Sequence, residues 1–498
     1  MVVIKPKRVG PFPFPKSEPE ARKKDFAEVE LPYTKEEAML EADRCLRCGT
    51  PVCIDACPVQ LDVRGMLDAV ANGDFKTAYH RIRETNPLLG VTARCCPQLD
   101  GLCEDACVVR WEGQPLSIGM VQRFVADWEQ NGSKQPDPES EPKTGKRVAV
   151  VGSGPAGLAA AELLTRYGHD VTIYEESEHL GGTAWYAIPD YHLPKDVLTY
   201  EAERIVGQGA TVKKGTRVGK DISLSALLSE SDAVVVATGS RDLKKFDVEG
   251  ADLAGVSDGY GFLESVYGNG VTEYLKGEIR PLGHEVLIVG GGDSALDCTR
   301  TALRLTQGHV MVAYRRTEKE MPADPIMVQE AREEGVEFMF LSDPVGYVGE
   351  EGRVNGAVMA SMELGEPDST GRRHPEPVPG KNFRVKCDNV LLAIGRGPDS
   401  FIEKTSGLKA GPKGSIAIDD HYRTSMAGVF ATGDVTTGET LVVRTMGHGR
   451  EAAQRVHEYL THTEDKHVSL YERYYTRRAT EESYQEMLMG KEEQLPPD

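Results

Sequence analysis

Apolar residues along the chain gather in short runs that end at glycine-rich turns. The longest run, residues 147–164 (RVAVVGSGPAGLAAAELL), is interrupted by Gly-Ser-Gly-Pro, which predicts a strand, a turn and a helix rather than a membrane span. A second run, EVLIVGGG, starts at residue 285 and leads to the strand HVMVAY (309–314). Two shorter runs, AVVVATGS (233–240) and GVFATGDV (428–435), have the form of a strand followed by a turn. The pattern predicts an α/β protein built largely from buried strands and the helices that cover them.

The turn at residues 152–157 has the spacing G-x-G-x-x-G of a dinucleotide-binding unit. Gly152 suits the tight turn, Gly154 lets the backbone approach a pyrophosphate, and Gly157 lets the helix pack on the strand. The next strand ends in Glu175, which can accept hydrogen bonds from ribose hydroxyls. With the segment HLGG at 179–182, the candidate cofactor-binding residues are Gly152, Gly154, Ala156, Gly157, Glu175 and Gly182.

A second copy of this arrangement begins at residue 285, and its second strand ends in Arg315 and Arg316 instead of an acidic residue. Guanidinium groups at this place suit the 2′-phosphate of NADP, whereas NAD favours a carboxylate. A solvated pair of loop arginines is the alternative interpretation. The candidate residues of this second site are Gly290, Gly292, Asp293, Ser294, Ala295, Arg315 and Arg316.

The 498 residues carry a formal net charge of −20 and include ten cysteines. This charge disfavours nucleic acids and anionic membranes as partners, because both would repel the chain. Prolines interrupt the basic segment at 1–24, so it does not have the apolar centre of a signal peptide. We therefore expect a cytoplasmic protein, in which cysteines serve a purpose other than disulfide bonding.

Eight of the cysteines lie between residues 45 and 107, and we expect the isolated Cys298 and Cys387 to be small core residues. The first four have the spacing C-x2-C-x4-C-x3-C-P, which resembles the cluster-binding run of bacterial ferredoxins. Zinc and disulfides remain alternatives, although zinc usually takes paired C-x2-C units. The side chains of adjacent Cys95 and Cys96 diverge, so we expect one of them to be a ligand. Seven thiolates then remain for two four-iron clusters, with one ligand position vacant.

The segment from Cys45 to residue 129 resembles the N-terminal iron–sulfur domain of the small subunit of NADPH-dependent glutamate synthase. The same domain opens dihydropyrimidine dehydrogenase and the large subunit of NADH-dependent ferredoxin:NADP oxidoreductases. The resemblance implies two 4Fe-4S clusters, one bound by Cys45, Cys48, Cys53 and Cys107, the other by Cys57, Cys96, Cys103 and Gln122. Gln122 stands where this family places a Glu or Gln ligand, and Cys95 departs from the family pattern.

Residues 30–460 also resemble two-dinucleotide flavoproteins such as glutathione and thioredoxin reductases. In that family the turn with Gly433 and Asp434 contacts FAD, and a helix, here 447–460, follows it. A plain helix cap is the alternative role for Asp434. The resemblance implies an NADP-binding domain inserted in an FAD-binding domain. The expected domains are a helical iron–sulfur domain at 1–140, FAD-binding parts at 146–280 and 397–460, the NADP-binding domain at 281–396, and a tail at 461–498.

The nucleotide-binding domains lack the cysteine pair of disulfide reductases, because Cys298 and Cys387 are far apart in the sequence. The resemblance therefore predicts an electron-input subunit, in which NADPH passes a hydride to FAD and electrons leave singly through the clusters. No side chain is required as an acid or base, so no catalytic residue is assigned. The preferred partner in a hetero-oligomer is the large subunit of a glutamate synthase. The alternatives are an electron-bifurcating or ferredoxin:NADP oxidoreductase, with a ferredoxin-linked flavoprotein subunit, and an assembly subunit without turnover.

Overall fold

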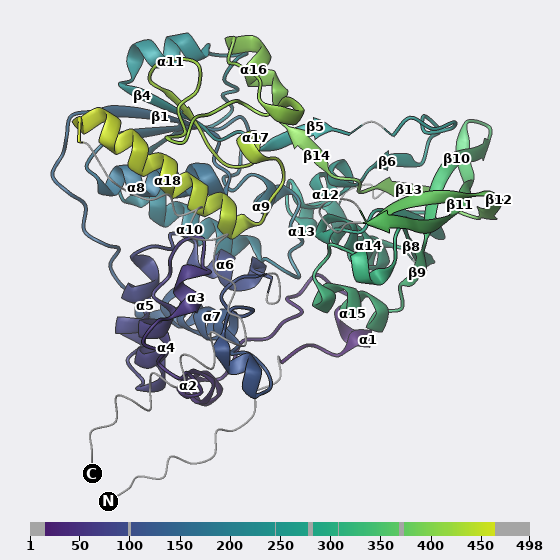
Figure 1. Cartoon of the computed structure of the whole chain (residues 1–498), viewed down its shortest axis with the longest axis horizontal. Coiled ribbons are helices and arrows are strands. Elements are labelled where there is room, and N and C mark those ends of the chain that lie inside the picture. Colours follow the sequence, from purple (N-terminus) through teal and green to yellow (C-terminus); the bar gives the residue numbers. More distant parts are fainter. Residues whose placement is uncertain are drawn as a thin grey trace, which may run out of the picture.

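The computed structural model describes residues 15–97, 101–244, 246–276, 282–306, 308–367 and 373–463. In the view of Figure 1, a helical N-terminal domain lies below the first of two β-sheet domains, and the second lies to its right. Both larger sheets are parallel with helices packed on them, which confirms the predicted fold class. The predicted tail lies outside the described residues from residue 464 onward.

Short amphipathic helices form the N-terminal domain, and side chains of the preceding residues cap several of them. Thr34 and Glu37 form a capping box at the start of α2, and Asp62 and Asp74 accept backbone N–H groups at the starts of α4 and α5. The helices of this domain are α2 (Lys35–Asp43), α3 (Val52–Asp55), α4 (Val63–Ala71), α5 (Phe75–Arg83), α6 (Leu89–Cys95), η1 (Val108–Glu112), α7 (Ile118–Trp128) and η2 (Glu129–Ser133), and α1 (Pro19–Arg22) precedes them in the sequence.

The first sheet has the strand order β15-β4-β1-β2-β3, and every pair in it is parallel. Its central strands are buried along almost their whole length, as the continuous apolar runs predict. Its strands are β1 (Arg147–Val151), β2 (Asp170–Tyr174), β3 (Thr211–Lys213), β4 (Ala233–Val236) and β15 (Val429–Ala431). The accompanying helices are α8 (Pro155–Arg166), α9 (Thr183–Tyr186), α10 (Lys195–Gly207), α11 (Leu224–Glu230), α16 (Ser400–Ser406), η4 (Pro412–Gly414), α17 (Asp434–Thr437) and α18 (Val442–Thr461).

The second sheet is also parallel, with the order β6-β13-β7-β8-β9. Because β6 precedes residue 281, the predicted boundary between 280 and 281 divides this sheet, and its first strand comes from the segment expected in the FAD-binding part. The strands are β6 (Val256–Asp258), β7 (Glu285–Val289), β8 (His309–Tyr314), β9 (Glu337–Phe340) and β13 (Asn389–Leu392). The helices are α12 (Gly259–Tyr267), α13 (Val271–Lys276), α14 (Asp293–Leu305), η3 (Glu318–Glu320) and α15 (Pro325–Glu333).

Two antiparallel additions were not expected from the sequence. β10 (Ser342–Glu350), β11 (Arg353–Pro367) and β12 (Arg373–Val385) form a three-stranded sheet that projects from the second domain (Figure 1). β5 (Ser240–Leu243) pairs with β14 (Arg396–Pro398), so the two chain segments that connect the sheets run side by side.

Hydrogen bonds attach two segments to the sheet domains. In the segment 134–146, Glu141 N donates to Arg166 O (2.7 Å) and Thr144 N donates to Gly168 O (2.9 Å). Near the N-terminus, Arg22 Nε donates to Glu334 Oε1 (2.9 Å), so α1 packs against the second sheet domain rather than the helical domain. No helix in the described ranges is both long and apolar enough to cross a membrane.

Candidate cofactor sites

The turn between β1 and α8 forms the floor of a cavity at the carboxyl end of the first sheet. Gly152 has φ +100°, and a Cβ there would lie 2.5 Å from Ala237 O, so the turn requires glycine. α8 begins at Pro155 directly after Gly154, which brings its first backbone N–H groups to the cavity. These features are the ones that dinucleotide-binding turns use to hold a pyrophosphate.

Glu175 stands at the end of β2 with its carboxylate fixed in the same cavity. Its Oε2 accepts hydrogen bonds from Ser153 N (2.9 Å) and Ser153 Oγ (2.6 Å), and its Oε1 accepts from Ser177 N (2.9 Å). Gly182 packs against the turn, because a Cβ there would lie 3.0 Å from Gly154 Cα. The carboxylate is thus held at the place where the sequence predicted a ribose contact.

The chain returns to this cavity through β15, which pairs with β4 and brings Gly433 and Asp434 beside the first turn. A Cβ on Gly433 would lie 2.8 Å from Ala156 Cβ. Burial raises the pKa of Asp434 to about 7, although Thr445 Oγ1 donates a hydrogen bond to its Oδ1 (3.0 Å). Of the residues predicted for this site, those that line the cavity are Gly152, Gly154, Ala156, Glu175, Gly182 and Asp434. Gly157 and Gly433 lie behind this lining.

The second dinucleotide turn lies between β7 and α14, where Gly292 precedes the helix. Asp293 Oδ1 accepts a hydrogen bond from Asp324 N (2.8 Å), and Asp293 and Ser294 line a second cavity. Gly290 and Ala295 pack together under the turn, since a Cβ on Gly290 would lie 3.2 Å from Ala295 Cβ.

The two arginines after β8 differ in their surroundings. Arg315 is exposed, whereas Arg316 is buried and its Nε donates to Arg373 O (3.1 Å). The two predicted guanidinium groups therefore have different surroundings, because packing against β12 holds Arg316. The preference for NADP stays a prediction that rests mainly on Arg315.

Four cysteines, here called the outer set, lie close enough to affect one another electrostatically. They are Cys45 and Cys48 between α2 and α3, Cys53 in α3, and Cys107 directly before η1. Burial raises the pKa of Cys53, and the neighbouring thiols Cys107, Cys45 and Cys48 raise it further. Burial likewise raises the pKa of Cys107 to about 11, with Cys45 and Cys48 again adding to the effect. Four thiolates this close need compensating positive charge, which iron would supply.

A second group, here called the inner set, lines one cavity: Cys57, Cys96, Cys103 and Gln122. Burial raises the pKa of Cys96 and of Cys103 well above the ordinary range, with Cys57 adding to both effects. Gln122 is buried, and its Nε2 donates to Leu89 O (2.8 Å) and Thr92 Oγ1 (2.8 Å). These bonds use both hydrogens of the amide nitrogen, so Oε1 is the atom of this side chain that suits iron.

Cys95 does not line the cavity of the inner set. It lines the second cavity beside Cys96, where burial raises its pKa to about 12 and Lys195 opposes the effect. Among the described residues, no three His, Cys, Asp or Glu side chains lie close enough to hold a single metal ion. A four-iron cluster presents one iron to each thiolate, so its ligands stand farther apart than those of one ion.

The first turn of α18 connects the three cavities and was missed in the sequence. Thr440 and Val442 line both the first and the second cavity, and Val443 lines the cavity of the inner set. The predicted helix at 447–460 in fact begins at Val442. The apolar pair at 442–443, eight residues after Asp434, was the available signal.

Comparisons with known proteins agree with this arrangement. The family described as "Pyridine nucleotide-disulphide oxidoreductase" matches residues 146–455, and the one described as "Dihydroprymidine dehydrogenase domain II, 4Fe-4S cluster" matches residues 22–134. The structure of Mycobacterium tuberculosis FprA in complex with NADPH has a TM-score of 0.55 and 17% identity to this chain, with coverage of 64% of this chain and 85% of that one. This likeness shows a shared fold.

Two curated relatives are similar over most of the chain. The small chain of glutamate synthase (NADPH) from Escherichia coli (strain K12) is 37% identical over 469 residues, which is 91% of this chain and 97% of that protein. The beta subunit of NADP(+)-dependent formate dehydrogenase from Moorella thermoacetica is 36% identical over 436 residues, which is 82% of this chain and 60% of that protein. Both relatives are, by name, one part of a larger enzyme.

Proposed function

The chain belongs to the glutamate synthase small chain-like family of NAD(P)H-dependent FAD oxidoreductases with a 4Fe-4S domain, and we propose that it is the electron-input subunit of a glutamate synthase. In this role it oxidises NADPH at FAD and passes electrons through two 4Fe-4S clusters to a larger catalytic subunit. When bound, FAD supplies the chemistry that converts a two-electron donor into single electrons, and the clusters carry them onward.

The residues of the first cavity suit FAD. Glu175 is held by Ser153 and Ser177 with both carboxylate oxygens facing hydrogen-bond donors, an arrangement that can orient a ribose. The start of α8 offers N–H groups to a pyrophosphate. Asp434, buried beside Thr445, offers a polar contact from the opposite wall.

One observation carries the proposal: successive residues of α18 belong to different cavities. Val442 lines the cavities of the two dinucleotide turns, and Val443 lines the cavity with Cys57, Cys96 and Gln122. Apolar side chains at this junction exclude water and keep the cofactor sites adjacent. A short connection between the flavin site and the inner set is what an electron-input subunit requires.

The seven cysteines and Gln122 are proposed as ligands of two clusters. The outer set lies next to exposed segments of the helical domain, so we propose that electrons leave there. We also propose a cytoplasmic location, since eight grouped free thiols suit a reducing compartment.

Anaerobic single-turnover mixing with NADPH tests this function. In the double variant Cys53→Ala/Cys57→Ala, we expect FAD content and flavin reduction to remain near wild type while electron delivery to the large subunit is lost. Cys298→Ala, at a buried cysteine of the second domain, is the matched control and should behave as wild type. If the FAD-loaded double variant still delivers electrons to the large subunit at the wild-type rate, the clusters are not the path of electron transfer.

The similarity to a formate dehydrogenase beta subunit favours a second candidate, in which the same electron-input module serves another reductase. Co-purification from the native source separates the two candidates. A large subunit that hydrolyses glutamine and makes glutamate supports the first, and a different redox subunit supports the second.

A further inference from the structure

Glu201 of α10, in the first sheet domain, contacts the backbone of α6 in the helical domain. Its Oε1 accepts a hydrogen bond from Gly90 N (2.8 Å), and the side chain is buried. A Cβ on Gly90 would lie 2.9 Å from Val197 Cγ1 and 3.2 Å from Glu201 Oε1, so α6 approaches α10 this closely only with glycine there. The contact joins two domains at a point near the inner set.

The helix that Glu201 holds also supports two members of the inner set. Leu89 O and Thr92 Oγ1, both on α6, accept the two hydrogen bonds from Gln122 Nε2. Cys96 follows α6 directly, and its backbone N donates to Thr92 O (3.0 Å). A displacement of α6 therefore moves the positions of Gln122 and Cys96 together.

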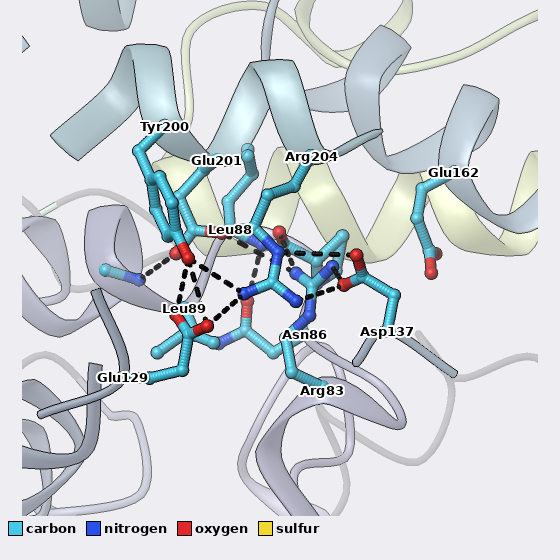
Figure 2. Close-up of polar contacts among 12 residues, drawn as sticks. Arg83, Asn86, Leu88, Leu89, Glu129, Asp137, Glu162, Tyr200, Glu201 and Arg204 are labelled. Carbon is cyan, nitrogen blue, oxygen red and sulfur yellow. Dashed lines mark hydrogen bonds and ion pairs between the residues drawn. The ribbon is translucent and has the colours of Figure 1, made fainter. Parts of the chain in front are cut away.

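An ionic network lies beside Glu201 and reaches its second carboxylate oxygen through Arg83 (Figure 2). Arg83 NH1 lies 3.6 Å from Glu201 Oε2, and Arg83 NH2 donates to Asp137 Oδ1 (2.6 Å). Arg204 NH2 donates to the same Asp137 oxygen (2.7 Å), and Arg204 NH1 lies 2.8 Å from Glu129 Oε1. Buried charges of this kind stay in place because each one needs its partners to offset desolvation.

We propose that Glu201 is a positioning residue for the inner cluster. By binding Gly90 N, it sets the place of α6, and α6 in turn places the amide of Gln122 and the thiolate of Cys96. The inference rests on the proposed function, because it takes the inner set as cluster ligands. It adds that the flavin domain itself determines the ligand geometry of the adjacent cluster.

The test compares Glu201→Ala with Glu201→Gln in the full chain, purified anaerobically with FAD and iron. The glutamine amide oxygen can still accept from Gly90 N, so Glu201→Gln should keep the wild-type electron paramagnetic resonance (EPR) spectrum and midpoint potential of the inner cluster. Glu201→Ala should shift both, or reduce iron from about eight to about four atoms per chain. FAD content and flavin reduction by NADPH should not change in either variant.

Gly90→Ala provides a second test that changes no charge. Its Cβ would press against Val197 and Glu201, and we expect the same spectral shift as in Glu201→Ala. Glu203→Ala, at an exposed position of the same helix α10, is the control and should leave the spectrum, the potential and the iron content unchanged.

Three outcomes would overturn the inference. An inner-cluster spectrum and potential that stay at wild type in Glu201→Ala would mean that Glu201 only stabilises the fold. Equal spectral shifts in Glu201→Ala and Glu201→Gln would mean that the bond to Gly90 is not the cause. A wild-type chain that takes up no iron on anaerobic reconstitution would overturn the proposed function and the inference together, and so would be distinguished from the other two.

Discussion

Gly447 of α18 lies against the backbone of Pro58, the residue that follows Cys57. A Cβ on Gly447 would lie 2.6 Å from Pro58 O and 3.2 Å from Pro58 C. The helix whose first turn lines the first cavity therefore touches the loop that carries an inner-set cysteine. Backbone contact of this kind leaves no room for a side chain at the domain boundary.

Replacement of Gly447 by alanine should separate α18 from the cluster domain. We expect a loss of about 1–3 kcal/mol in stability from overpacking, and slower electron transfer from reduced flavin to the clusters with flavin reduction itself unchanged. Rapid mixing with NADPH, monitored at flavin and cluster wavelengths, measures both steps. Gly207→Ala in α10 is the matched control, since nothing lies within 4 Å of a Cβ there. Equal transfer rates in the two variants would contradict the prediction.

Replacement of Gln122 by alanine should remove the oxygen ligand and two hydrogen bonds to α6. We expect iron to fall from about eight to about four atoms per chain, while Gln122→Glu keeps a ligand oxygen and retains the cluster. Iron analysis and EPR after anaerobic reconstitution measure the effect. Gln329→Ala, on the exposed face of α15, serves as the control. Full iron content in Gln122→Ala would show that this side chain is not a ligand.

Residues that satisfy local rules were predictable from the sequence. Gly152 and Glu175 follow from the geometry of a single strand–turn–helix–strand unit, and both occupy the expected places. The return of Asp434 to the same cavity followed from resemblance to a known family, because no local rule pairs segments so distant in sequence. Both Cys95 and Cys96 line the second cavity, and only Cys96 also lines the cavity of the inner set, so the choice of Cys96 as the ligand stays a prediction.

Features that depend on tertiary packing were not predictable. Arg315 and Arg316 are adjacent in the sequence, and only the packing of Arg316 against Arg373 on β12 makes their surroundings different. The place of β6 in the second sheet was not predictable, because its partner strand, β13, lies more than a hundred residues later in the sequence. The sequence around Gly90 gives no sign that glycine is required there. The structure supplies the reason, because α10 approaches too closely for a side chain at this position.

His169 should make stability depend on pH in the acid range. Burial, together with the neighbouring His457, lowers the pKa of His169 from 6.5 to about 4, and the two rings contact at 3.0 Å between Nε2 and Nδ1. The unfolded chain then binds more protons than the folded chain between these values, so stability falls as pH drops through that window. The loss reaches at most about 2 kcal/mol at pH 5.

A His169→Gln variant removes this titration. Its Tm should decrease less than the wild-type Tm when the pH is lowered from about 7.5 to about 5. Thermal unfolding of both proteins at both pH values, followed by circular dichroism, measures the difference. Parallel decreases in the two proteins would show that His169 does not contribute.

Arg315 should decide the choice of nucleotide, since it is exposed after β8 while Arg316 is buried against Arg373 O. In Arg315→Glu, a repelling charge replaces a phosphate partner, and the KM for NADPH should rise about tenfold or more with little change for NADH. Dye reduction with each nucleotide measures this ratio. Arg353→Glu, at an exposed position on β11, is the control and should leave the ratio unchanged.

Arg316→Glu should instead lower Tm, because it buries a charge and removes the donor to Arg373 O. A wild-type protein that already prefers NADH, or an Arg315→Glu variant with unaltered preference, would assign the second site to NAD.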